Sequence, residues 1–126
     1  FDFAEWYILF KTSPLDLVAR GEAIIRMLDK QINDIVRNAT NYLLNDLEVL
    51  GVNCTVNFSE VAGQLAEKST SGIGVAWFQR KDGLYQYSLR SRSDIDCSVV
   101  AKSFGGGGHK NASGFESDTF VLKTIC

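Results

Sequence analysis

Apolar residues recur at helical spacing in the first third of the chain and at alternate positions in much of the rest. From Val18 to Leu43 their spacing is that of one helix face, which predicts one long amphipathic helix that ends near residue 43. Ser13 and Pro14 suit its start, because serine caps free backbone N–H groups and proline fits the first helical position. The helix has apolar residues on two sides, so a further domain could pack against it.

Shorter patterns follow along the chain. Alternation over 52–58 predicts a strand, and helical spacing over 59–68, opened by a capping serine, predicts a helix. Two alternating runs joined by a Lys-Asp-Gly turn predict a β-hairpin over 72–90. Residues 97–104 predict a short helix that runs into four glycines, and 114–126 a closing strand or hairpin. The order indicates an α/β fold, a mixed β-sheet packed with helices and preceded by a long N-terminal helix.

Composition places the chain among ordinary globular proteins. Of its 126 residues, 45% are hydrophobic and 22% are charged. No apolar run is as long as the roughly 18 to 20 residues of a membrane span, and the start does not resemble a signal peptide. The three cysteines are widely spaced, without a disulfide framework or a CxxC zinc pair. We therefore expect a cytoplasmic protein with reduced thiols and no membrane association.

The first residue, Phe1, indicates a piece of a longer protein, because a translated chain begins with methionine. The aromatic segment 1–10 fits this interpretation, since it suits contact with a missing domain. Packing of the same segment on this domain's own core is the alternative.

Charge is unevenly distributed. The net charge is −2, but residues 80–110 carry six basic and three acidic side chains, and the remainder is acidic. This distribution argues against a broad basic surface for nucleic acid. We expect the chain to bind any anionic ligand locally, near the glycines.

The stretch FGGGGHKNASGF, residues 104–115, is the strongest candidate for chemistry. It matches neither the GxGxxG nor the P-loop pattern, because His109 separates the last glycine from Lys110. Glycines still let a backbone approach a ligand and turn successive N–H groups towards an anion, here flanked by His109, Lys110 and Asn111. A flexible hinge, or a tight crossing of two backbones, is the alternative.

A second group of polar side chains lies on the strand that includes residues 87–91. Alternation puts Ser88, Arg90 and Arg92 on one face and Tyr87, Leu89 and Ser91 on the other. Two arginines on one face suit bidentate recognition of phosphate. The alternative is a solvated strand face with no ligand.

The segments SLRS (88–91) and DIDCSVVAKSFGGGGHKNASGF (94–115) together resemble the DHH-associated domain of the first subtype. This is the C-terminal domain of many DHH-family phosphoesterases, and the similarity covers roughly residues 50–116. It divides the chain into an N-terminal linker with the long helix, 1–43, and the associated domain, 44–126.

The resemblance implies a substrate-holding role. In such enzymes a DHH domain binds manganese, and the associated domain closes over a short single-stranded oligonucleotide or a small phosphorylated nucleotide. Gly105, Gly106, Gly107, Gly108 and His109 would then lie at the phosphate that faces the metals, with His109 as a catalytic donor, although a lone histidine is often structural. Arg90 would grip another phosphate, with Ser88, Arg92, Lys110 and Asn111 in support.

The chain lacks the residues for a metal site of its own. It has one histidine and no DHH tripeptide, and the pair Asp94 and Asp96 suits the start of a helix better than a metal. We expect no cofactor in this piece, no hydrolysis by it alone, and manganese in the missing N-terminal DHH domain of the same chain. Two alternatives remain: a stand-alone nucleic-acid-binding module, such as the related domains that end some alanyl-tRNA synthetases, or a structural domain that forms a homodimer through its long helix.

Overall fold

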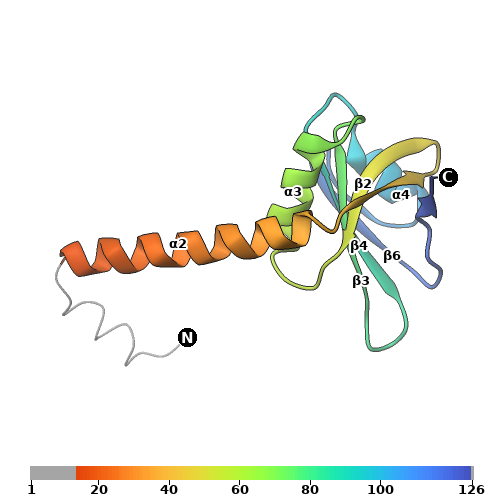
Figure 1. Cartoon of the computed structure of the whole chain (residues 1–126). Coiled ribbons are helices and arrows are strands. Elements are labelled where there is room, and N and C mark those ends of the chain that lie inside the picture. The colour runs from red at the N-terminus through yellow and green to blue at the C-terminus, as the bar shows by residue number, and fades with distance from the viewer. Residues whose placement is uncertain (1–13, 126) are drawn as a thin grey trace. The chain divides into compact units, whose positions relative to one another are not determined.

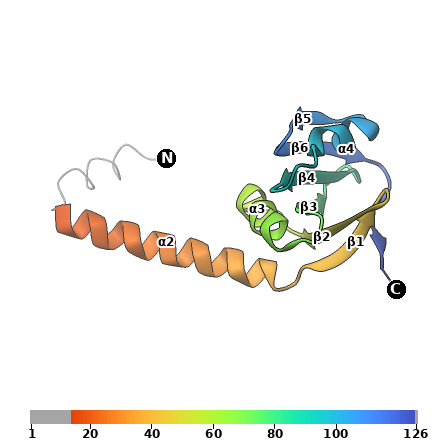
Figure 2. The same ribbon diagram turned by 90° about the horizontal axis from the view of Figure 1, so that it is seen from above.

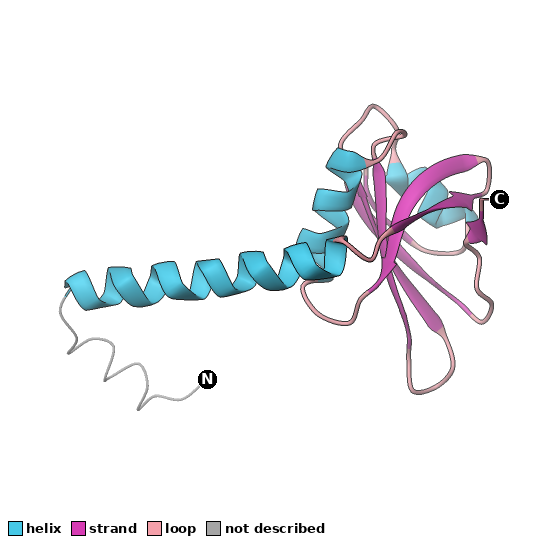
Figure 3. Cartoon of the chain, in the orientation of Figure 1, coloured by secondary structure: helices cyan, strands magenta, loops and turns pink. Residues whose placement is uncertain are grey.

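Figure 1 shows the computed structural model of the chain, and Figure 3 shows its helices and strands by colour. The structure describes residues 14–125, which fall into two units that divide between Asn33 and Asp34. Helix α2 (Pro14–Val36) begins in the first unit and ends in the second. The expectations for the aromatic segment 1–10 and for Ser13 lie outside the described residues.

Helix α2 ends earlier than the apolar spacing predicted. It stops at Val36, and residues 40–44, which were expected to be its last turns, form a strand. Asn38 and Ala39 make the turn between them, each donating its N–H to a carbonyl three residues back. The prediction was wrong because Leu43 fits a helical repeat as well as a strand, and the pairing of residues 40–44 with residues 47–51 decides the outcome.

The second unit is built on a seven-stranded mixed sheet in the order β5-β6-β4-β3-β2-β1-β7. Its strands are β1 (Thr40–Leu44), β2 (Leu47–Asn53), β3 (Ile73–Gln79), β4 (Tyr85–Ser91), β5 (Gly107–His109), β6 (Ala112–Ser117) and β7 (Lys123–Thr124). Helix α3 (Phe58–Lys68) connects the parallel pair β2 and β3, and α4 (Cys97–Ser103) follows β4. The predicted α/β class, the β3–β4 hairpin and both short helices are confirmed.

The strand predicted over 52–58 is displaced. Strand β2 ends at Asn53, and the chain then turns into α3 through Asn57, whose φ of +53° is left-handed. Val56 is 56% exposed, so the alternation seen in the sequence does not reflect a buried face there. Asn57 also occupies the N-cap position that was assigned to Ser59, and its side chain makes no capping hydrogen bond.

The two short helices cover opposite faces of the sheet (Figure 2). Helix α3 approaches β3 so closely that a Cβ at Gly74 would lie 2.2 Å from the carbonyl oxygen of Ala62. On the other face, α4 contributes Cys97 and Ala101 to a core that also holds buried side chains of the strands, among them Val75, Tyr87, Leu89 and Phe115. The sheet therefore has one face that bears α3 and one that bears α4. Among the described residues, no helix is both long and apolar enough to cross a membrane.

Candidate functional site

The first two glycines of the run end helix α4. The N–H of Gly105 donates to the carbonyl of Lys102 at 3.0 Å, and that of Gly106 to the carbonyl of Ala101 at 2.9 Å. This pair of bonds is the Schellman motif, which favours a left-handed residue after the helix, and Gly105 has φ +86°. Both N–H groups are thus engaged by the helix and are not turned towards an anion. The expected nest of successive N–H donors is wrong for these two residues.

Gly106, besides ending the helix, and Gly108 lie close to the backbone of strand β6. A Cβ at Gly106 would be 2.1 Å from the carbonyl oxygen of Gly114, and a Cβ at Gly108 would be 2.5 Å from the Cα of Ser113. Both are therefore required by a tight crossing of two backbones, which was the alternative to an anion loop. Gly107 differs, because nothing lies within 4 Å of the place its Cβ would occupy. Within this run, packing leaves only Gly107 without a structural reason to be glycine.

Strand pairing places two of the predicted donors on one row across the sheet. Ala112 of β6 is the register partner of Arg90 in β4 and of His109 in β5. Directly opposed residues share a face, so Arg90 and His109 lie on the α3-bearing face, two strand spacings or roughly 10 Å apart. The next row on that face consists of Ser88, Gly114 and Gly107. Ser88 has a small side chain and the two glycines have none, so this row forms a shallow shelf beside Arg90 and His109.

Arg90 is a positioned cation with no acidic partner among residues 14–125. One guanidinium nitrogen donates to Ser59 Oγ at 3.0 Å, and another to the carbonyl oxygen of Leu89 at 2.8 Å. Guanidinium carries five N–H donors, so others remain for a ligand. The neighbouring arginines differ, because Arg80 pairs with two carboxylates at 2.7 Å and Arg92 has Glu67 at 3.9 Å. Among the ion pairs of residues 14–125, none involves Arg90.

A hollow of about 500 Å³ lies over the shelf. It is lined by Gln86, Tyr87, Ser88, Gly105, Gly106, Gly114, Phe115 and Glu116. Glu116 would repel an anion, but its carboxylate is bound to Arg80 at 2.7 Å. Arg90, on the row next to Ser88, leaves a positive charge near the hollow that no ion pair of residues 14–125 compensates.

The structure brings together some of the predicted site residues and separates others. Ser88, Arg90, Gly107 and His109 share one region of the sheet; the alternation predicted the common face of Ser88 and Arg90, and the strand pairings add Gly107 and His109. Lys110 and Asn111 form the exposed β5–β6 turn, where their carbonyls accept hydrogen bonds from Cys97 and Ser91. Arg92 lies beyond the end of β4.

Two residues of this region were missed by the sequence reasoning. Ser59 was considered only as a helix cap, yet its hydroxyl holds Arg90. Glu116 lies two residues beyond Gly114 on β6, and extending the period-two pattern along that strand would have placed it on the same face.

Asp96 and Cys97 serve the fold at the start of α4. Asp96 caps the helix by accepting from the N–H of Ser98 at 3.0 Å, and the hydrogen bond from the Ser98 hydroxyl lowers the pKa of Asp96. Burial raises the pKa of the Cys97 thiol, which keeps it protonated. In the described part of the chain, no three or more His, Cys, Asp or Glu residues gather as a metal site would need. The described His, Cys, Asp and Glu residues are thus too scattered to hold a manganese ion together.

The chain is similar to known proteins in two respects. Residues 54–123 match the DHHA1 domain, a stretch that includes β3 to β6, both short helices and the glycine run. A stretch of 35 residues is 66% identical to an uncharacterized protein of Acanthamoeba polyphaga mimivirus, and covers 27% of this chain but only 8% of that protein. Because the family match extends over more than half of the chain, the protein belongs to the DHHA1 domain family, which is associated with DHH phosphoesterases.

Proposed function

We propose that this domain holds the phosphorylated substrate of a DHH-type phosphoesterase, on the face formed by β4, β6 and β5. The observation that carries the proposal is Arg90, half-buried and hydrogen-bonded to Ser59 but without a carboxylate partner among the described residues. A guanidinium held in this way is pre-organised for a phosphate oxygen, because little side-chain freedom is lost on binding.

The shelf beside Arg90 suits the close approach of a phosphate. At Gly107 no side chain stands between a ligand and the backbone, and Ser88 on the same row offers a hydroxyl. His109 lies across the shelf from Arg90, and in the whole enzyme it would donate to the phosphate that reacts. Manganese would belong to a separate DHH domain, so no step through a metal is derived for this chain.

Charge favours a small substrate. The chain has a net charge of −2, and Glu116 at the far end of the hollow is an acid bound to Arg80. A long duplex would meet acidic surface away from Arg90, whereas a short single-stranded oligonucleotide or a small phosphorylated nucleotide would not.

The test is a ¹H–¹⁵N NMR titration of this chain with a 5′-phosphorylated dinucleotide, following the Gly107 amide and the Arg90 side chain. We expect saturable shifts whose Kd rises at least tenfold, about 1.4 kcal/mol, in Arg90→Gln. The matched control is Arg37→Gln, since the Arg37 side chain is 76% exposed and loses the same charge.

Equal weakening by the two variants would mean general charge attraction and would refute a defined site. Shifts that appear instead along many exposed lysines, with steep salt dependence, would favour the stand-alone nucleic-acid-binding module. Unchanged amides at several millimolar ligand would refute substrate holding by this domain alone.

A further inference from the structure

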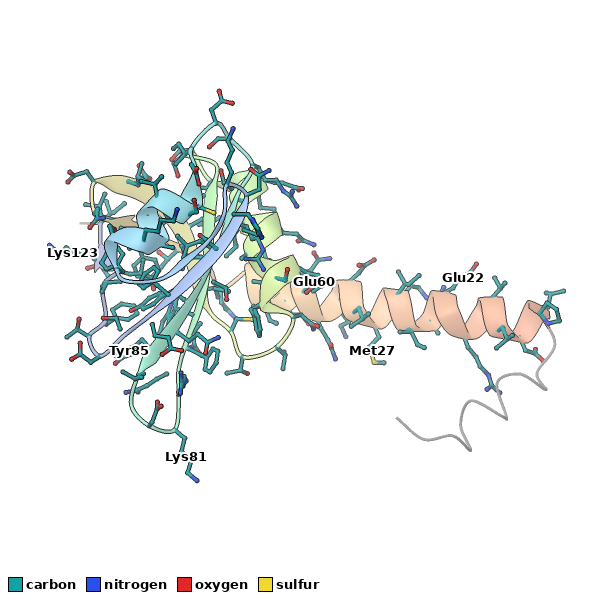
Figure 4. The ribbon with its side chains drawn as sticks, turned by 180° about the vertical axis from the view of Figure 1, so that it is seen from behind. Glu22, Met27, Glu60, Lys81, Tyr85 and Lys123 are labelled. Atoms are coloured by element: carbon teal, nitrogen blue, oxygen red, sulfur yellow. The ribbon has the colours of Figure 1, made fainter. Side chains whose placement is uncertain are left out.

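A second hollow, of about 610 Å³, lies on the face of the sheet that bears α4. It is lined by Asn53, Trp77, Gln79, Tyr85 and Phe120. In the sheet Trp77 pairs with Tyr87 and Gln79 with Tyr85, so these side chains point away from the face that carries Arg90 and Ser88. Figure 4 shows Tyr85 on β4, near the hairpin turn that carries Lys81. The proposed phosphate site leaves this hollow unexplained.

Three aromatic rings form its walls and are inclined to one another. The ring centroids of Trp77 and Phe120 are 4.7 Å apart at an interplanar angle of 65°, and those of Tyr85 and Phe120 are 5.5 Å apart at 60°. Rings in this edge-to-face arrangement do not cover one another's faces as a parallel stack does. A flat ring that enters could stack on one wall while its edge meets another.

Phe120 is fixed although it is exposed. The Val121 N–H donates to the Tyr87 hydroxyl at 3.0 Å, that hydroxyl lies 3.4 Å from the Thr119 carbonyl, and Leu122 is buried. These contacts hold the backbone on both sides of Phe120, whose side chain is 39% exposed. An aromatic wall is thus already in place before any ligand arrives, which lowers the entropy cost of binding.

The polar groups of the hollow are neutral. The amide nitrogen of Asn53 donates to the Trp77 carbonyl at 3.2 Å, and that of Gln79 to the Gly83 carbonyl at 3.3 Å. Each carboxamide retains an oxygen acceptor and a second N–H donor. The lining contains no charged residue. In addition, the indole Nε1 of Trp77 is the buried side-chain donor that lacks a partner in the described residues.

From these features we infer that the hollow binds a nucleobase with an exocyclic amino group, adenine being the best fit. Aromatic walls stack on any base, whereas a carboxamide with both donor and acceptor free pairs with the N6 and N7 edge of adenine. The neutral lining disfavours phosphate. The base could come from a free nucleoside or nucleotide or from a single strand. The inference does not rest on the proposed phosphate site, which lies on the other face.

The experiment follows the Trp77 indole N–H signal of the whole chain during titration with adenosine, which has no phosphate. The signal of Trp6 is identified with Trp6→Phe. We expect saturable shifts with adenosine and at least tenfold weaker binding of uridine, which lacks the amino group. Adenosine monophosphate and a short oligoadenylate then distinguish the source, because tighter binding of the oligomer indicates a single strand and equal binding a free nucleotide.

Two variants make the location falsifiable. Gln79→Ala should weaken adenosine binding at least tenfold, whereas Gln86→Ala, a carboxamide on the opposite face of the hairpin, should leave it unchanged. The inference would be overturned if the two variants had equal effects, or if adenosine and uridine bound equally well. Tighter binding of methyl glucoside than of adenosine, or unchanged spectra at ten millimolar adenosine, would also overturn it. Arg90→Gln should not alter adenosine binding, so this site and the phosphate site can fail separately.

Discussion

Replacing Gly106 and Gly107 by alanine, one at a time, tests whether the glycine run combines packing with ligand access. The two residues are neighbours and receive the same added methyl group. Their surroundings differ, because the new Cβ of Gly106 would meet the backbone of β6 while that of Gly107 would meet open space. The pair therefore controls for composition and for position in the chain.

The expected magnitudes follow from the distances. At Gly106 the methyl would lie 2.1 Å from the Gly114 oxygen and 2.8 Å from the Phe115 Cα, so the backbone that precedes β5 must move away from β6. Such overpacking costs about 1–3 kcal/mol. A Cβ added at Gly107 would have no atom within 4 Å, and the φ of Gly107 is not left-handed. Alanine there should therefore change stability by at most about 1 kcal/mol, in the stabilising direction.

Thermal and urea unfolding, followed by circular dichroism, measure both effects. One kcal/mol corresponds to roughly 4–8 °C in the melting temperature of a domain of this size, so Gly106→Ala should melt at least 4 °C below the native protein. Gly107→Ala should melt at or above the melting temperature of the native protein. Although it is folded, it should bind the phosphorylated dinucleotide about tenfold more weakly than the native protein does. A Gly106→Ala protein as stable as the native one, or an unfolded Gly107→Ala protein, would refute the assignment.

Two further predictions concern the fold around the sites. Tyr87→Phe leaves the Val121 N–H without its acceptor and should cost about 1–3 kcal/mol in urea unfolding. Burial raises the pKa of Tyr87, so native stability should decline as the pH rises above about 10, and less so in this variant, as unfolding at several pH values would show. The pKa of Asp96 is lowered in the folded state, so its stabilising effect is present at neutral pH and is lost as the pH falls through that lowered value. Asp96→Asn should reduce the acid sensitivity of the melting temperature, and an unchanged profile would contradict the capping role.

Local pattern was sufficient for the parts of the fold with one clear period. The β3–β4 hairpin has a short turn and strict alternation, so the faces of Ser88 and Arg90 followed directly from the sequence. The end of α2 did not, because Leu43 satisfies both a helical and an alternating repeat until pairing of β1 with β2 decides between them. The strand around Val52 was misplaced for a related reason: a left-handed turn at Asn57 interrupts the alternation without a glycine or proline to signal it.

The site was only partly predictable. Its residue types were evident, but the row that joins Arg90 to His109 depends on two strand pairings that no local pattern specifies. The different roles of the four glycines were equally hard to predict, since they depend on where α4 ends and on the contact with β6. The aromatic hollow escaped notice because Asn53, Trp77 and Phe120 come from three distant segments.

The pairing of β7 with β1 has a consequence for synthesis. Tyr42 and Thr124, which are register partners, come from opposite ends of the folded sheet's sequence. While the ribosome is still making the middle of the domain, the outer edge of β1 is open, and such an edge can pair with another nascent chain. Expression of a piece cut to the family match, 54–123, would remove β1 and β2 altogether and expose β3 instead. A shortened form intended for crystallisation should therefore keep every residue from Thr40 to Thr124.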